Sequence, residues 1–247
     1  MIKKFFLNII ANFILSKNKV IRRELESINQ IFLDKMITKV TLQVLEIGPG
    51  ERNLYSDRYN IENISINLTL IDANSDLISK SISKKLNTRI FKGVVPQDLS
   101  KFKEKTFDLV VCSHVIEHLS KEDGYILMYE LDRITKFVSL ISTPNGFSWQ
   151  TPIDSRNQVD WYNAHLSSWT PHELKECGYF EQFGEVGPKS VFGPGAAAKF
   201  KINNFLGMSL GILYPLFQRF PNFMYAFSAL KRHRIDSNDY LRKPPNF

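Results

Sequence analysis

The sequence of 247 residues predicts an α/β fold built around a doubly wound, mostly parallel β-sheet. Two observations lead to this prediction. From residue 41 onward, short β-rich runs alternate with helical stretches, which is the pattern of parallel strands joined by crossover helices. A glycine turn also follows the first of these runs directly, and open sheets of this kind bind their ligands at such turns.

The expected strands are short apolar runs between turn residues. They cover 42–47, 67–71, 88–92, 107–112 and 137–142, with helices near 75–86 and 121–135. Thr170, Pro171 and Glu173 have the pattern of an N-cap, a first-turn proline and a capping-box acid, so a further helix is expected to end at Gly178. More strand material is expected at 179–191.

The chain is expected to hold one domain with two appendages. Residues 1–40 form an N-terminal helical extension, residues 41–195 the α/β domain, and residues 196–247 an apolar, basic and helical C-terminal extension. With 43% hydrophobic residues, a chain of this length can bury one substantial core. The two cysteines, Cys112 and Cys177, suggest neither a disulfide scaffold nor a zinc site, which is consistent with a cytoplasmic protein.

The net charge of +7 is concentrated at the two ends of the chain. Residues 1–40 carry eight Lys or Arg against three acids, residues 199–247 carry eight against two, and the part between is net acidic. Since both ends are also rich in Phe, Ile and Leu, they favour an anionic membrane surface over a nucleic acid as partner. Peripheral contact with the inner face of the cytoplasmic membrane is expected through residues 1–16 and 199–232.

The two apolar end segments leave several interpretations open. Apolar residues between positions 2 and 14 follow one helical face opposite lysines and asparagines, which predicts a basic amphipathic helix. Such a helix either binds a membrane or packs on the domain. The apolar run 205–217 is too short to span a bilayer, which takes about 20 residues. This run lies on a membrane, closes a pocket or forms a dimer contact. A homo-oligomer is therefore one of the remaining interpretations.

The stretch VLEIGPG at 44–50 is the first candidate binding motif. Gly48 and Gly50 lack the side chains that would block close approach of a ligand to the backbone. Glu46 precedes the first glycine by two residues, where a carboxylate can bind an ammonium group but would repel a dinucleotide pyrophosphate. Asp72 ends the next apolar strand, where a carboxylate accepts hydrogen bonds from two ribose hydroxyls. The pattern predicts a site for a nucleoside that carries an ammonium group.

The order of four motifs is similar to that of the class I S-adenosylmethionine-dependent methyltransferases: VLEIGPG, TLIDAN, FDLVVCSHVIEHL and FVSLISTPNGF. The later stretches NAHLSSWTPHEL and CGYF resemble a bacterial branch found among surface-polysaccharide and lipid-modifying enzymes. The resemblance covers residues 42–195 and implies a Rossmann-like sheet of seven strands with S-adenosylmethionine as cofactor. It also implies that Ser113 and His114 line the wall beside the methionine moiety.

Two departures from that family concern the adenine end of the cofactor and the turn that follows Gly50. Many relatives carry an acid near residue 94, whereas this chain has Val94 and Val95 there. Asp98 substitutes for that acid, or the backbone of the two valines binds adenine alone. Arg52 stands where a third glycine is common.

The acceptor side offers histidines as candidate catalytic residues. His114 follows the fourth expected strand, and His165 lies in the long loop 143–169. A neutral imidazole at His165 could remove a proton from an acceptor hydroxyl, or could instead hold the loop by bonding its backbone. The aromatic residues of this loop either line the acceptor pocket or pack the loop: Trp149, Trp161, Tyr162 and Trp169.

No metal site is expected from the sequence. Glu117 and His118 would need a second acid and a second histidine at one point, and no second acid stands at helical spacing. A cap at the entry to the helix 121–135 is the favoured interpretation of these two residues.

The expected function is methyl transfer from S-adenosylmethionine to a small-molecule, glycan or lipid-linked acceptor. The alternative is a non-catalytic nucleoside-binding or scaffold protein with the same fold. A nicotinamide dehydrogenase is disfavoured by Glu46 and by the missing third glycine.

Overall fold

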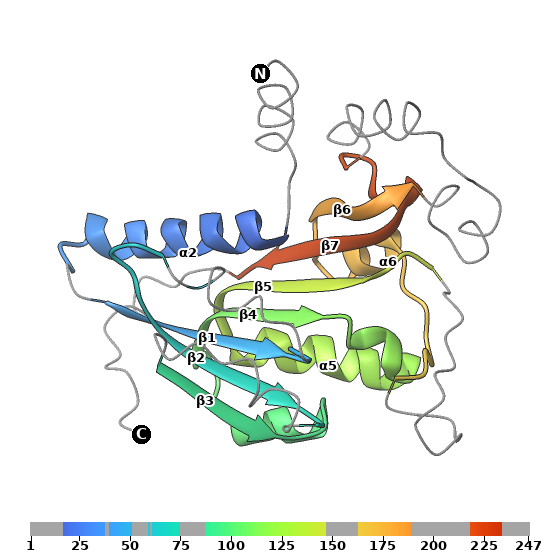
Figure 1. Cartoon of the computed structure of the whole chain (residues 1–247), viewed down its shortest axis with the longest axis horizontal. Helices are drawn as coiled ribbons and strands as arrows, with labels where there is room; N and C mark the ends of the chain where they lie inside the picture. Colours follow the sequence, from blue (N-terminus) through green and yellow to red (C-terminus); the bar gives the residue numbers. More distant parts are fainter. Residues whose placement is uncertain are drawn as a thin grey trace, which may run out of the picture.

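A computed structural model describes residues 17–37, 40–50, 59, 61–74, 87–146, 163–188 and 218–233. Seven strands form a single sheet in the order β3-β2-β1-β4-β5-β7-β6, with helices packed against it (Figure 1). The strands are β1 Thr41–Ile47, β2 Ser65–Asp72, β3 Asn87–Lys92, β4 Phe107–Ser113, β5 Thr135–Pro144, β6 Glu181–Pro188 and β7 Met224–Arg232. The α-helices are α2 Lys17–Asp34, α5 Lys121–Ile134 and α6 Pro171–Glu176, and the 3₁₀ turns are η1 Gln97–Lys101, η2 Ile116–His118 and η3 Pro221–Phe223.

The sheet is mostly parallel, as the sequence predicted. Strand β1 pairs in parallel with β2 and β4, which pair in parallel with β3 and β5. Only β7 runs against its neighbours, since it pairs antiparallel with both β5 and β6. This is the Rossmann-like arrangement of seven strands that the resemblance implied.

Alternating apolar side chains bury both faces of the central strands. Val44 and Leu45 are both fully buried but belong to separate core clusters, because successive side chains of a strand point to opposite faces. The cluster around Val44 includes the apolar face of α2. The cluster around Leu45 includes α5 and α6. The sheet therefore carries helices on both faces, as expected of a doubly wound fold.

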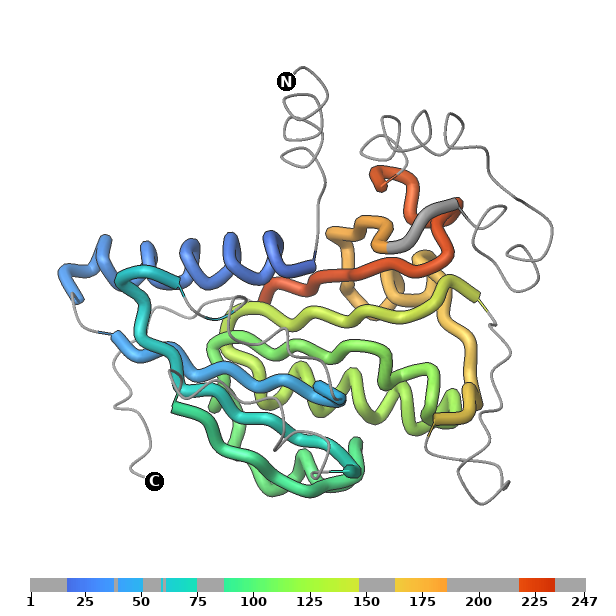
Figure 2. The backbone as a smooth tube through the Cα atoms, in the orientation of Figure 1, coloured from blue at the N-terminus to red at the C-terminus, as the bar shows by residue number. Residues whose placement is uncertain are grey.

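Helix α2 is fixed to the far end of the chain by a buried ion pair. Glu24 is only 1% exposed, and Arg232 at the end of β7 donates hydrogen bonds to it, with Nη1 2.5 Å from Oε2. Arg232 also bonds Glu181 of β6, at 2.6 Å. Figure 2 shows α2 beside the end of β7 that carries this arginine. A buried carboxylate requires such a partner, so the contact fixes where α2 meets the sheet.

Strand β7 was not predicted from the sequence. Residues 224–232 were expected within the C-terminal extension, yet the structure places them between β5 and β6. The segment MYAFSALKR holds two residues that favour strands, Tyr225 and Phe227, but no Val, Ile or Thr, and Ala, Ser and Lys have little preference for strands. Its strand conformation comes from pairing on both sides instead of from local propensity.

Several other expectations can be checked at the level of single elements. The Thr170 capping box is confirmed, with its hydroxyl accepting from Glu173 N and the Glu173 carboxylate accepting from Thr170 N. Helix α6 ends at Glu176, and Gly178 follows with a φ of 93°, which favours glycine. The helices expected at 2–14 and 75–86 and the apolar run 205–217 lie outside the described residues. No helix of the described part is long and apolar enough to cross a membrane.

Asp108, at the start of β4, is a buried carboxyl whose environment favours the neutral form. Burial raises its pKa to about 6, although it accepts a hydrogen bond from Gln43 N at 2.7 Å and lies 3.9 Å from Lys136 Nζ. In the unfolded chain the pKa returns to its ordinary value of 3.8. The folded state therefore binds more protons between these two values, and stability falls as the pH rises through this window.

We expect the pH dependence of stability to change when Asp108 is replaced by asparagine. A shift of about two pKa units corresponds to about 3 kcal/mol. The free energy of unfolding of the native chain minus that of Asp108→Asn should therefore fall by about 3 kcal/mol between about pH 4 and pH 7. Urea titrations at several pH values measure this difference.

Subtracting the free energies of unfolding of the two proteins removes the contribution of a second buried group, His233. Burial lowers the pKa of His233 to about 4, so this histidine adds stability as the pH rises through the same window. Both proteins carry His233, and its contribution cancels. A difference that stays constant with pH would show that Asp108 is charged in the folded protein.

Candidate active site

The residues of the candidate site gather where three neighbouring strands end. Ile47 of β1 pairs with Ile71 of β2 and with Cys112 of β4. The residues that follow these three positions are Gly48, Asp72 and Ser113, so they meet at one edge of the sheet. This edge lies beside β1 and β4, where the strand order reverses direction, and such switch points are the usual ligand sites of open α/β sheets.

The glycine turn needs its two glycines for different reasons. Gly48 and Gly50 have φ angles of 66° and 61°, which side chains rarely adopt. A Cβ on Gly48 would lie 2.1 Å from Cγ2 of Val115, whereas a Cβ on Gly50 would meet no described atom within 4 Å. Gly48 is thus required by packing within the protein, and Gly50 is the position where the backbone borders open space.

Glu46 is buried behind this turn. Its side chain is 2% exposed, and Oε2 accepts a hydrogen bond from the hydroxyl of Tyr59 at 2.7 Å. Tyr59 is fully buried and was not singled out in the sequence, since no pattern around it indicated a contact with β1. Tyr59 is therefore an additional residue of the site that orients the Glu46 carboxylate.

Asp72 joins the first two loops of the site. Its Oδ2 accepts from Gly50 N at 3.2 Å, and its Oδ1 accepts from Asn74 N at 2.8 Å. A carboxylate has about four acceptor positions, so two remain for further donors. The structure thus brings Asp72 to the glycine turn, as expected for an acid that binds a ribose.

The turn after β3 packs closely on itself next to Asp72. Gly93 N donates to the carbonyl of Asp72 at 3.0 Å, and Val94 N donates to Oδ2 of Asp98 at 2.7 Å. Asp98 also pairs with Lys101, and the hydrogen bonds from Lys101 and from Val94 N hold the pKa of that carboxyl below its ordinary value. The amide of Val94 is already used within the turn. Val95 is buried, and the Asp98 carboxylate lies at this turn beside the two valines. Both predictions for the adenine, the Asp98 carboxylate and the backbone of the valines, stay open.

Ser113 and His114 follow β4. Ser113 Oγ is buried and has no hydrogen-bond partner among the described residues. His114 has a φ of 54°, and its backbone N donates to Ser142 O at 2.8 Å, which directs the chain away from the sheet. Its ring Nδ1 lies 3.1 Å from Oε1 of Glu117. A buried hydroxyl near Gly48, without a hydrogen-bond partner among the described residues, is a feature that a ligand at this edge would satisfy.

Glu117 is a buried acid in the η2 turn. Burial by itself would raise the pKa of its carboxyl, but the hydrogen bond and the positive charge of His114 outweigh burial and hold the pKa below its ordinary value. Its Oε2 accepts from Thr143 Oγ1 at 3.1 Å. Glu117 is therefore a buried negative charge beside His114.

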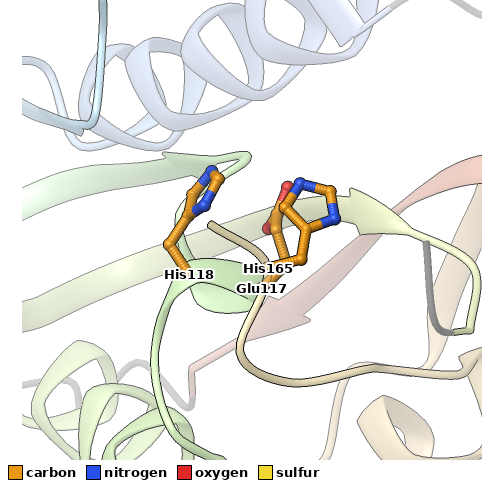
Figure 3. Close-up of side chains that lie close together, drawn as sticks. All are labelled: Glu117, His118 and His165. Carbon is orange, nitrogen blue, oxygen red and sulfur yellow. The ribbon is translucent and has the colours of Figure 1, made fainter. Parts of the chain in front are cut away.

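The expected capping role of Glu117 and His118 is not what the structure shows. Ser120 is the N-cap of α5, and its side chain accepts from Asp123 N. Glu117 and His118 lie in η2 and face His165, which comes from the loop before α6 (Figure 3). The rings of His118 and His165 lie 5.0 Å apart at 67°. The sequence could not reveal this group, because its members are separated by nearly fifty positions.

Trp169 packs the long loop onto the domain. It is fully buried, its Nε1 donates to Ile116 O at 3.2 Å, and Lys121 Nζ lies 3.6 Å from the centre of its ring. Of the two interpretations of this tryptophan, the structure supports packing. Trp149, Trp161 and Tyr162 lie outside the described residues.

These features make this edge of the α/β sheet the candidate site for a nucleoside. The open position beside Gly50, the carboxylate of Asp72 and the unpaired hydroxyl of Ser113 fit the ribose and methionyl parts of S-adenosylmethionine. When bound, this cofactor supplies a methyl group on a positively charged sulfur, which needs alignment more than further activation.

Comparison with known families identifies the chain. Residues 20–184 match the model of the methyltransferase domain. The chain belongs to this family, and it is an S-adenosylmethionine-dependent methyltransferase. No curated protein gives a significant match to the sequence.

Solved structures of methyltransferases resemble the chain at low sequence identity. A SAM-dependent methyltransferase from Archaeoglobus fulgidus is 19% identical with a TM-score of 0.48, over 84% of this chain and 94% of that protein. An S-adenosylmethionine-dependent methyltransferase from Mesorhizobium loti is 13% identical with a TM-score of 0.45, over 83% of this chain and 98% of that protein.

Proposed function

We propose that the protein methylates a small-molecule, glycan or lipid-linked acceptor that enters beside His114. One observation supports this placement above all others. The Gly50–Asp72 contact and the His114–Glu117 pair follow strands β1, β2 and β4, which are direct neighbours in the sheet. A cofactor bound at Gly50 and Asp72 would thus lie next to an acceptor bound at His114 and Glu117. Such positioning is proposed as the main contribution to the rate of methyl transfer.

The residues of the cofactor side have separate proposed roles. Glu46 binds the methionine ammonium group, directly or through water, while Tyr59 holds its carboxylate. Asp72 accepts from the ribose hydroxyls, and Asp98 accepts from the adenine amino group. Ser113 lies against the methionyl part, where its unpaired hydroxyl finds a partner.

His114 and His165 are the two candidates to take a proton from the acceptor. The contacts of His114 favour it as the base. Its Nδ1 donates to the buried carboxylate of Glu117 at 3.1 Å, which leaves Nε2 as the nitrogen that can accept a proton. A carboxylate paired in this way also stabilises the imidazolium that forms. His165 lies close to the same carboxylate.

The nature of the acceptor is proposed from the sequence of the two ends. Both ends combine basic and apolar residues, which suits a lipid-linked or polysaccharide-related acceptor at an anionic membrane. We expect the full chain to sediment with anionic vesicles, and a chain without residues 1–16 to sediment less. Equal amounts of both proteins in the supernatant would contradict this placement.

Calorimetry with S-adenosylhomocysteine and with NADH tests the proposed cofactor site. We expect one molecule of S-adenosylhomocysteine to bind per chain, with no heat from NADH. Methyl transfer is then assayed on a panel of hydroxyl-bearing and amine acceptors. Binding without turnover on the whole panel would favour the alternative of a non-catalytic nucleoside-binding or scaffold protein.

A further inference from the structure

Three side chains with the chemistry of metal ligands converge on the acceptor side of the site. Glu117 and His118 come from η2, and His165 comes from the loop before α6 (Figure 3). One ligand atom from each residue lies within 4.8 Å of the others. Ligand atoms at tetrahedral angles on one ion lie about 3.3–3.6 Å apart when each bond is about 2.0–2.2 Å long. Small rotations of these side chains would therefore bring their three ligand atoms onto one ion.

His118 is held in the form that a metal requires. Its Nδ1 lies 3.1 Å from the carbonyl oxygen of Ala164. A carbonyl can only accept a hydrogen bond, so Nδ1 carries the proton and Nε2 keeps its lone pair. A backbone carbonyl on the second ring nitrogen is the usual partner of a histidine that binds a metal.

Glu117 is likewise oriented by neighbouring donors. Thr143 Oγ1 donates to one carboxylate oxygen and His114 Nδ1 to the other, both at 3.1 Å. Each oxygen retains a further acceptor position. Hydrogen bonds of this kind fix ligating carboxylates in metal sites.

The loop that carries His165 is tied to the η2 turn by its backbone. Leu166 N and Ser167 N both donate to the carbonyl of Glu117, at 2.8 and 3.1 Å. Ser167 Oγ donates to the carbonyl of Ile116 at 3.1 Å. His165 is therefore placed beside Glu117 by the fold itself and not by a chance contact of two surface side chains.

We propose that Glu117, His118 and His165 bind a divalent transition metal ion of the Zn²⁺ type. Two imidazoles and one carboxylate match the preference of Zn²⁺ for nitrogen and oxygen ligands, whereas Mg²⁺ favours oxygen ligands alone. Three protein ligands leave at least one coordination position open, as in catalytic zinc sites. The sequence did not predict this site. That prediction assumed that a metal would need four protein ligands, including a second acid.

The metal site narrows the acceptor of the proposed function to an oxygen nucleophile. This step rests on the proposed methyl transfer. An acceptor hydroxyl bound at the open position becomes more acidic and gives its proton to His114, the base of the proposed function. The oxygen lone pair then forms a bond to the methyl carbon, while the carbon–sulfur bond breaks and its electron pair stays on sulfur. The products are the methyl ether and S-adenosylhomocysteine.

Calorimetry of the purified full chain with Zn²⁺ and with Mg²⁺ tests the site. We expect one Zn²⁺ per chain and much weaker binding of Mg²⁺. His165→Gln and Glu117→Gln should each weaken Zn²⁺ binding by about 100-fold or more, since changes to outer partners alone cost about 10–100-fold. His172→Gln is the matched control, because this histidine is 78% exposed and pairs only loosely with Glu176, at 3.7 Å.

The same samples separate failure of the metal site from failure of the proposed function. Circular dichroism and S-adenosylhomocysteine binding report whether each variant keeps its fold and cofactor site. Equal Zn²⁺ affinity of the native chain and His165→Gln, or no Zn²⁺ binding by a native chain that binds S-adenosylhomocysteine, would overturn the proposal. Co²⁺ provides a second readout, because its visible spectrum should change in the native chain and His172→Gln but not in His165→Gln.

Discussion

Replacing Asp72 by alanine is expected to weaken the binding of S-adenosylhomocysteine by about 100-fold. Hydrogen bonds to a charged acceptor contribute about 1.5–3 kcal/mol each, and the carboxylate is proposed to accept from two ribose hydroxyls. The change also removes the acceptor of Gly50 N, so the glycine turn loses its link to β2. Calorimetric titration of both proteins with S-adenosylhomocysteine measures the effect.

Two variants control this prediction. Asp72→Asn keeps one acceptor oxygen and should lose less affinity than the alanine variant. Gly50→Ala leaves the Asp72 carboxylate in place but puts a methyl group where no described atom lies within 4 Å, so it should weaken binding through the ligand and through the strain of a side chain at a φ of 61°. Gly48 is a poorer choice, since a side chain there collides with Val115 and disturbs the protein itself. Unchanged affinity in Asp72→Ala would place the ribose elsewhere.

Replacing Trp169 by alanine is expected to lower the free energy of unfolding by about 3–5 kcal/mol. The ring is fully buried, and it fits against Gly124 so closely that a Cβ there would lie 2.3 Å from Trp169 Cζ2. Its removal leaves a cavity between the loop and α5 and leaves the Ile116 carbonyl with one donor fewer. Urea denaturation measures the loss.

Phe180→Ala is the matched control for the tryptophan. This aromatic residue lies only eleven positions away but is 71% exposed, so its removal should change stability by less than about 0.5 kcal/mol. A similar small effect in Trp169→Ala would mean that the loop before α6 does not pack on the domain in solution.

The parts of the fold that local patterns encode were predictable. Strands such as 107–112, observed as Phe107–Ser113, consist mostly of apolar residues buried on both faces, and the Thr170 capping box lies within four consecutive residues. β7 could not be predicted, because its pairing with β5 and β6 is long-range and it holds no β-branched residue.

In the candidate site, too, features encoded by local patterns were predictable and long-range contacts were not. Gly50 and Asp72 follow predicted strands, so their meeting at one edge follows from the parallel sheet. The contact of Tyr59 with Glu46 and that of His165 with Glu117 depend on loop paths that no periodicity encodes. Trp169 had two interpretations in the sequence, and only its burial decided between them.

The insertion of β7 between β5 and β6 has a consequence for synthesis on the ribosome. In the described sheet β6 pairs only with β7, a strand that is made about forty residues later. A nascent chain that ends before Met224 would thus expose the edge of β5 and leave β6 without a partner, and unpaired edges promote aggregation. Completion of the sheet, together with the Glu24–Arg232 contact, must wait until nearly the whole protein has been translated.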